Sequence, residues 1–364
     1  MHIIKKYISA LDKSIMMLYN ILSDRVADTC EACDRGSFCG GSLLLYMEVR
    51  NMSKPFLTYV QQIDKLRNEK NLIIDDEDYA LEMLKQIGYF KLIGGYKHLF
   101  KNKTTHKYKD NTHFEDIVRL YMFDETLREL HLKYILKAEQ QLKSLISYYF
   151  CDRYGDTQTA YLTKTNYNYT TAQNKRDIDR LVNMLNDNYI NRTTDYPYIN
   201  HTKTKHKNLP LWVLINALTF GNISKMYLLL PQGLQINISK NYKFINEKQL
   251  GQITTVLTKF RNACAHGERL FTYRTNDSIP DLKIHSKLNI PKKGNQYIYG
   301  KNDLFSVVIS LRYLLPANHF WEYKQKLKKL INDYLKKSPI AQEDFLNEIG
   351  FPTNWSDITR YKNI

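Results

Sequence analysis

The 364-residue sequence lacks any apolar run close to the roughly 18 residues that a membrane-spanning helix needs. Its N-terminal apolar stretch is interrupted by Asp12 and Lys13, which argues against a secretory signal peptide. Cysteine is scarce as well, because the long chain carries only five, an odd number that is typical of proteins in a reducing compartment. These absences predict a cytoplasmic protein without membrane association.

A complete metal-binding motif is also missing. Cys30, Cys33 and Cys39 lie close together, and the spacing of the first two suits zinc ligation. No matching pair of cysteines or histidines follows downstream, so we expect neither a metal site nor a cofactor. Residues 1–51 have mixed composition and no sustained pattern, whereas Met52 opens a natural-looking start. We therefore interpret residues 1–51 as an extension whose composition suits translated upstream sequence, and residues 52–364 as a single helical domain.

Acidic residues are too few to balance the basic ones. The chain has 53 Lys and Arg against 37 Asp and Glu, which gives a net charge of +16. Apolar residues make up 43% and aromatic residues 13%, so the chain is expected to be globular. The basic excess favours a polyanionic partner, which could be RNA, DNA or an anionic membrane surface, and the 28 tyrosines could stack on bases. The alternative is an AT-rich genome, which by itself encodes many Lys, Asn, Ile and Tyr residues.

Strand patterns and internal repeats are absent, and the apolar period is helical from Lys54 onward. The clearest helix is expected over 114–150, where apolar residues recur at steps of three and four. We predict an all-α fold, with residues 155–175 as a loop or a weakly packed segment. The other helices are expected at 56–72, at 75–100 with an interruption at Gly94 and Gly95, at 176–189, at 211–230 with a bend at Gly221, at 247–266, and at 303–336.

A second loop is expected before residue 210, and it is rich in basic residues. Lys203, Lys205 and Lys207 alternate there with His201 and His206. One interpretation is a solvated loop without a ligand. The other is a phosphate contact, which makes the three lysines candidate RNA-binding residues.

The stretch KFRNACAHGERLF, residues 259–271, stands out from its surroundings. If 247–266 is one helix, its core stripe leaves Arg261 to one side and His266 nearly opposite. Gly267 is then expected as the C-terminal cap, with His266 at the negative end of the helix dipole. The small residues between Arg261 and His266 would allow another helix to approach closely. The core stripe is expected to contain Leu250, Ile253, Val256, Leu257, Phe260 and Cys264.

These residue types suit metal-independent cleavage of RNA. A histidine can move a proton to or from the reacting oxygens. An arginine can hold the scissile phosphate with two parallel hydrogen bonds and stabilise its charge. The alternative is a surface Arg261 and a capping His266 without any chemistry, and the spacing alone favours that alternative.

Several stretches together, including LPLWV, TFGNISKMY and RNACAH, resemble the abortive-infection (Abi) family of the AbiD/AbiF type. The resemblance runs from about Ser53 to Trp355, and that family belongs with the HEPN superfamily. It implies a helical core at about 114–275, further N-terminal helices and C-terminal helices over 303–364. It also implies a dimer that pairs two Arg–His motifs in one composite site.

Carried over by position, the resemblance assigns four residues to the catalytic site. Arg261 and His266 form the motif, Asn262 takes the polar position after the arginine, and Glu139 is the acidic residue that orients the motif. Lys143 stands where relatives often carry arginine, and it is the candidate RNA contact on that helix. Related toxins are silenced by adenylylation of a tyrosine two residues after the histidine; here Glu268 stands there, so that control is not expected.

The resemblance implies a ribonuclease toxin of phage defence, restrained by a small structured RNA. Its products would carry a 2′,3′-cyclic phosphate and a 5′-OH. Two other functions remain open at the level of sequence. One is a non-catalytic protein that captures a structured small RNA, and the other is a purely structural helical adaptor.

Overall fold

The computed structural model describes residues 55–361 and confirms an all-α fold. The chain divides between Thr58 and Tyr59 into two units, and the described helices belong to the second. Cys30, Cys33 and Cys39, like the whole extension 1–51, lie outside the described residues. In the described part, the only strands are β1 (Lys292–Lys293) and β2 (Gln296–Tyr297), which form one short hairpin.

Helix α5 (Phe114–Tyr154) organises this unit, and its 41 residues make it about 60 Å long. The Asp116 carboxylate accepts a hydrogen bond from the His113 backbone N–H at 3.0 Å, which caps the start of the helix. Gly155, with a positive φ of 86°, ends it. The helix agrees with the one predicted from residue 114 onward, one turn longer than expected.

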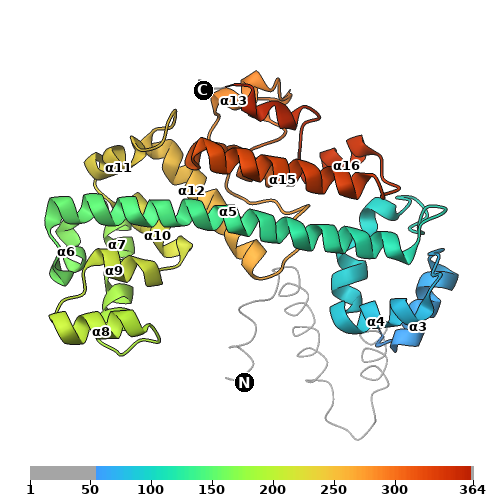
Figure 1. Ribbon diagram of the computed structural model, residues 1–364, viewed down its shortest axis with the longest axis horizontal. Helices are drawn as coiled ribbons and strands as arrows, with labels where there is room; N and C mark the ends of the chain where they lie inside the picture. The colour runs from blue at the N-terminus through green and yellow to red at the C-terminus, as the bar shows by residue number, and fades with distance from the viewer. Residues whose placement is uncertain (1–54, 362–364) are drawn as a thin grey trace, which may run out of the picture. The chain divides into compact units, whose positions relative to one another are not determined.

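Most other helices lie around α5 (Figure 1). α12 (Glu247–Ala265) and α15 (Ala317–Leu335) pack along it, and smaller contacts come from α9, α10, α11 and α14. The remaining bounds are α3 (Tyr59–Asp64), η3 (Lys65–Glu69), α4 (Glu77–Ile87), η4 (Phe90–Gly94), η5 (Lys97–Phe100), α6 (Gln158–Leu162), η6 (Lys164–Asn166), α7 (Ala172–Leu185), η7 (Asn186–Ile190), α8 (Pro197–His206), α9 (Leu211–Leu214), η8 (Ile215–Ala217), α10 (Phe220–Leu229), α11 (Gln232–Ser239), α13 (Lys283–Lys287), α14 (Leu304–Leu314), α16 (Gln342–Ile349) and η9 (Trp355–Thr359).

Helix α12 carries the motif and is fixed at both ends. Asn246 and Gln249 form a capping box, in which each side chain accepts a hydrogen bond from the other's backbone N–H. At the other end, Gly267 adopts a positive φ of 65° and the Glu268 N–H donates to the Ala263 carbonyl at 3.0 Å. The predicted core stripe is confirmed, because all six of its residues are buried.

Three predicted helix boundaries are wrong. The helix expected over 303–336 is broken at Pro316, which has no N–H to donate and starts α15 instead. The helix expected over 75–100 ends at Ile87, because Gly88 has a positive φ of 88°, and not at Gly94 and Gly95. Gly221 lies inside the first turn of α10 and makes no bend.

Two predicted loops are also wrong. Residues 155–175 contain α6 and η6 and pack firmly, since Tyr161 and Tyr167 are buried and their hydroxyls donate to the carbonyls of Leu209 and Tyr161. The basic segment before residue 210 is helix α8, which Pro197 opens and Lys207 ends in the left-handed conformation. The composition of residues 155–175 is polar, but Tyr161 and Tyr167 are buried and their hydroxyls are hydrogen-bonded. This is why the segment packs into the fold although its composition predicts a loop.

Candidate functional site

Glu139 and Lys143 form a buried ion pair on α5. The Lys143 Nζ lies 2.8 Å from the Glu139 Oε1, and the two side chains are 8% and 6% exposed. They stand one helical turn apart, which is the spacing at which side chains on a helix meet. Lys143, predicted as an RNA contact, therefore has its ammonium directed to Glu139.

Arg261 reaches the same carboxylate from α12. Its Nε lies 3.7 Å from the Glu139 Oε2, and the arginine side chain is 27% exposed. That separation is too long for a hydrogen bond, and both the Nε and the Oε2 are buried atoms without any hydrogen-bond partner in the described residues. The structure thus brings Glu139, Lys143 and Arg261 together and leaves the pair between the two helices incomplete.

His266 and Asn262 lie on the exposed side of α12. His266 forms the C-cap, its backbone N–H donates to the Asn262 carbonyl at 2.9 Å, and both side chains are exposed. Within residues 55–361 the His266 imidazole makes no hydrogen bond or ion pair. Arg261 and His266 are five residues apart, which places them about 140° apart around the helix. One copy of the chain therefore directs the two motif side chains to different sides.

The small residues between them serve mainly to pack α12 within the chain. Ala263 and Cys264 are 2% and 6% exposed, and only Ala265 is exposed. The expectation that all three let another helix approach is wrong for the first two, which face the core instead. Burial raises the pKa of the Cys264 thiol to about 12, and Asp124 adds to this effect, so the thiol is not a nucleophile.

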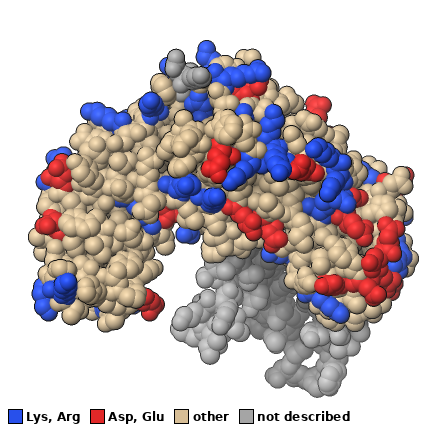
Figure 2. All heavy atoms as spheres, viewed as in Figure 1, with Lys and Arg blue, Asp and Glu red and all other residues tan. Residues whose placement is uncertain are grey.

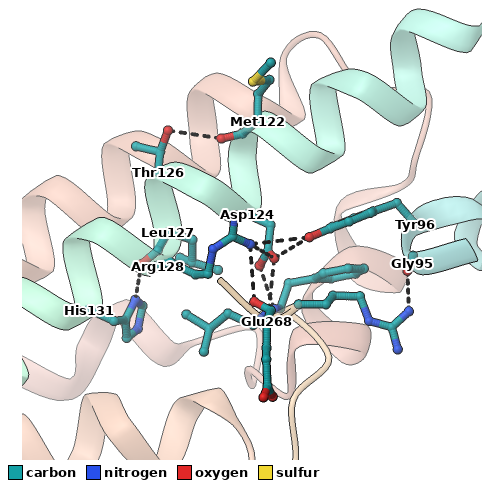
Figure 3. A network of polar contacts seen from close by, with 12 residues as sticks. Gly95, Tyr96, Met122, Asp124, Thr126, Leu127, Arg128, His131 and Glu268 are labelled. Carbon is teal, nitrogen blue, oxygen red and sulfur yellow. Dashed lines mark hydrogen bonds and ion pairs between the residues drawn. The ribbon is translucent and has the colours of Figure 1, made fainter. Parts of the chain in front are cut away.

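The segment that follows His266 is tied to α5 by a buried polar network (Figure 3). The Asp124 carboxylate accepts hydrogen bonds from the Tyr96 hydroxyl and the Arg128 Nη1, both at 2.7 Å. It also accepts from the backbone N–H groups of Leu270 and Phe271, at 3.0 and 2.7 Å. Asp124 is fully buried, so these four donors replace the water that it loses.

Arg128 completes this connection to the motif. Its Nη1 also donates to the carbonyl of Glu268 at 3.3 Å, two residues after His266. The position of the His266 backbone is therefore set from both sides, by α12 before it and by the Asp124 network after it. These residues were not predicted from the sequence, although a signal existed: Asp124, Arg128 and His131 stand on or beside the apolar stripe of the clearest helix, where charged groups need partners.

The three lysines of the basic segment differ in their surroundings. The Lys203 Nζ donates to the carbonyls of Tyr189 and Arg192, both at 2.8 Å, and burial lowers the pKa of this lysine. Lys205 and Lys207 are exposed. Lys203 therefore holds the preceding loop, and only the other two have their side chains in solvent.

One group of possible metal ligands is present in the described residues. Single ligand atoms of Asp75, His113 and Glu115 lie within 4.8 Å of one another. The His113 Nδ1 is 2.5 Å from the Asp75 carboxylate, so these two already form an ion-paired contact beside the start of α5. The group lies at the start of α5, away from Glu139, and contains none of the predicted site residues.

A comparison with protein families identifies the chain. The model of the Abi-like protein family matches residues 82–272. The chain belongs to this family. The matched part holds both α5 and the whole motif of α12, and it is narrower than the span from Ser53 to Trp355 over which a resemblance was expected. Membership ties the Abi-like chain to abortive infection.

No curated protein and no solved structure matches the chain. Within residues 55–361, no helix has the length and apolarity needed to cross a membrane.

Proposed function

We propose that this Abi-like protein is a metal-independent endoribonuclease of the HEPN type, with Arg261 and His266 as its catalytic residues. One observation carries the proposal. The Arg261 Nε lies 3.7 Å from the buried Glu139 carboxylate and has no hydrogen-bond partner among the described residues, and an exposed His266 without a partner in the same part of the chain follows five residues later. A buried polar atom without a partner is costly, and such groups are found where function requires them.

Each side chain has a chemical task in this proposal. Arg261 holds the scissile phosphate through its guanidinium and stabilises the charge on the phosphate oxygens. His266 transfers a proton, either from the 2′-OH that attacks phosphorus or to the 5′ oxygen that leaves. Glu139 orients the guanidinium, and Lys143 in turn holds Glu139. The products are a 2′,3′-cyclic phosphate and a 5′-OH.

The divergence of the two motif residues supports a dimeric site. Because Arg261 and His266 lie about 140° apart around α12, a composite site would take the arginine from one copy and the histidine from another. Two exposed residues could face a second copy, namely Ala265 on α12 and Leu136 on α5, which is 41% exposed and about one turn before Glu139.

Point variants test the proposal directly. His266→Ala should reduce RNA cleavage by about 10² to 10⁴, the contribution of one acid–base group. Arg261→Ala should reduce it by about 10² to 10³, the contribution of one donor that stabilises charge in the transition state. The control is Arg176→Ala, which removes an exposed arginine on α7 and should leave cleavage unchanged. Cleavage should persist in EDTA. Full cleavage by His266→Ala, or activity that disappears with EDTA and returns with a divalent ion, would refute the mechanism.

Mixing the two inactive variants tests the dimer. If Arg261 and His266 act across copies, a mixture of Arg261→Ala and His266→Ala protein contains sites with both residues intact, and some cleavage should return. Size-exclusion chromatography with light scattering should show dimers for both variants. Monomers, or a mixture that remains inactive although heterodimers form, would argue for a site within one chain.

A second candidate function is capture of a structured small RNA without cleavage. It is favoured by the net charge of +16 and by the exposed Lys205 and Lys207 at the end of α8. Binding of an RNA hairpin should weaken steeply with salt, and Lys205→Ala/Lys207→Ala should flatten the log–log slope by about 1.8 if each lysine contacts one phosphate. An unchanged slope would remove α8 from the interface, and binding without any cleavage would favour this function over the first.

A further inference from the structure

A cavity of about 670 Å³ lies between the loop before α12, the α14–α15 junction, the C-terminal segment and Gln141 of α5, and neither Arg261 nor His266 lines it. Its wall is unusually aromatic. The aromatic side chains that line it belong to Tyr242, Phe244, Tyr313, Phe320, Trp321 and Tyr361. Two of these rings are largely in solvent, since Phe244 is 52% and Trp321 is 59% exposed. Both rings are open to solvent where they line the cavity, so the cavity offers flat surfaces to a ligand.

The backbone at Phe244 also departs from the ordinary. Its φ is +66°, in the left-handed region that a bulky residue rarely adopts. Strain of this kind persists only where the surrounding structure imposes it, and it is found often at binding sites. Lys243 precedes the ring and also lines the cavity, and Arg312 lies within its wall. The cavity wall therefore combines an exposed aromatic ring with two basic residues.

A basic surface continues from this aromatic cavity along α15. Trp321 is followed along the helix by a shallow hollow of about 410 Å³. The hollow is lined by Gln325, Lys328, Lys329, Asn332, Asp333 and Lys336. Lys and Arg side chains gather over α15 on the face that Figure 2 shows. At a rise of about 1.5 Å per residue, Trp321 and Lys336 are about 22 Å apart along the helix.

Two lysines in this hollow are available to a ligand. Nearby, Lys326 pairs with Glu322, and Lys336 lies 3.5 Å from Asp333. Lys328 and Lys329 are exposed and, among the residues that the structure describes, form no ion pair. Neither ammonium group is therefore held by a direct ion pair within the described part of the chain.

We propose that the aromatic cavity and the lysine face of α15 form a binding track for single-stranded RNA. Bases stack on Trp321 and Phe244, and phosphates face Lys328 and Lys329. Exposed flat rings followed by unpaired cations are the combination by which proteins hold unpaired strands without reading their sequence. A duplex keeps its bases inside the stack and could not use the rings. The track contains neither Arg261 nor His266, so binding there is independent of the proposed cleavage.

Binding of a fluorescent oligoadenylate of about 12 nucleotides tests the track. The His266→Ala protein serves as the background, so that cleavage cannot consume the probe. Trp321→Ala should raise the Kd by about 5- to 150-fold, the range found for loss of one stacking ring. Trp212→Ala is the matched control, because Trp212 is 48% exposed on α9, away from the cavity, and its loss should leave the Kd unchanged. Equal effects of the two replacements would overturn the proposal.

The salt dependence tests the lysine face. Lys328→Ala/Lys329→Ala should reduce the slope of log Kd against log salt by about 1.4, because each phosphate contact on a single strand contributes about 0.7. Lys103→Ala/Lys107→Ala removes the same charge from an exposed loop and should not change the slope. An unchanged slope in the first pair, or equally strong competition by duplex RNA or polyglutamate, would overturn the proposal. These measurements use binding alone, so their failure is distinct from failure of the proposed cleavage.

Discussion

Two of the buried carboxylates on helix α5, those of Asp124 and Glu139, have surroundings that differ sharply. Asp124 accepts four hydrogen bonds from donors in three parts of the chain, and every one of these is 3.0 Å or shorter. Glu139 has one close partner, Lys143, while its second oxygen faces Arg261 at 3.7 Å without a hydrogen bond. All hydrogen bonds of the first site are made, whereas the second has one carboxylate oxygen and one Nε that make no hydrogen bond in the described residues.

This difference distinguishes Arg128, whose role is structural, from Arg261, the candidate catalytic arginine. Arg128 is 5% exposed and is directed to Asp124, so its charge is used within the fold. Arg261 is more exposed, and Glu139 would keep its closest partner if Arg261 turned toward a ligand. A phosphate could therefore take up the free hydrogen-bonding capacity of Arg261 at little cost to the fold.

The largest effect on stability is expected for Arg128→Ala. The replacement leaves a fully buried Asp124 without its cation and should lower the free energy of unfolding by about 3–5 kcal/mol. It also removes the hydrogen bond to the Glu268 carbonyl, which loosens the segment after His266. Urea unfolding followed by circular dichroism measures the loss.

Arg153→Ala is a suitable control, since it removes an arginine from the exposed last turn of the same helix. If Arg128→Ala costs no more than this control, then the Asp124 network does not stabilise the fold as its geometry indicates.

Acid should destabilise the protein through His131, a buried residue that lies between Asp124 and Glu139 on α5. Burial lowers the pKa of this imidazole from 6.5 to about 4, while its bond to the Leu127 carbonyl acts the other way. The unfolded chain therefore binds the proton more readily, so stability is fully present above about pH 6.5 and is lost as the pH falls toward 4. The loss reaches about 3 kcal/mol.

Unfolding measured at about pH 7 and about pH 4.5 checks this effect. The pH dependence should be smaller in His131→Asn, which cannot take up a proton. An equal pH dependence in both proteins would place the acid sensitivity elsewhere. The measurement also matters for the cleavage profile, because unfolding at low pH would by itself reduce cleavage.

The contrast between the two carboxylates also shows which features of the fold and the site can be predicted from the sequence. Helical periodicity is sufficient to predict helix α5 and the core stripe of α12, because burial in a helix repeats every three to four residues. The motif Arg261–His266 was visible as a pattern, but its environment was not. Whether Lys143 contacts RNA or pairs with Glu139 depends on burial, and this is decided by packing between distant helices.

The predictions that the structure contradicts also failed for physical reasons that a local pattern does not contain. Pro316 ends a helix within an unbroken helical period, and the polar segment 155–175 packs through tyrosines whose hydroxyls find carbonyl partners. The Asp124 network was not predicted because its donors lie in segments around Tyr96 and Leu270, far from α5 in sequence. Local patterns specify helices well and long-range polar pairing poorly.

A smaller effect is expected for Tyr96→Phe. The Tyr96 hydroxyl is one of the four donors to Asp124, and burial together with Asp124 raises its pKa far above the usual value, so it remains protonated. The phenyl ring can keep the stacked contact with Phe271, whose centroid is 5.6 Å away. Loss of one hydrogen bond should therefore cost about 1 kcal/mol. A cost as large as that of Arg128→Ala, measured by the same urea unfolding, would mean that the four donors act as one unit.

The smallest effect on stability is expected for Arg261→Ala, and it is the most informative. Removing Arg261 leaves Glu139 paired with Lys143 at 2.8 Å, and the lost contact was a 3.7 Å approach of a partly exposed guanidinium. Stability should change by less than about 1 kcal/mol. RNA cleavage should nevertheless be lost, in contrast to the behaviour of Arg176→Ala. Urea unfolding and cleavage are measured on the same preparation, beside Arg128→Ala. If Arg261→Ala destabilises the protein as much as Arg128→Ala does, Arg261 is a structural arginine, and loss of cleavage in that variant says nothing about catalysis.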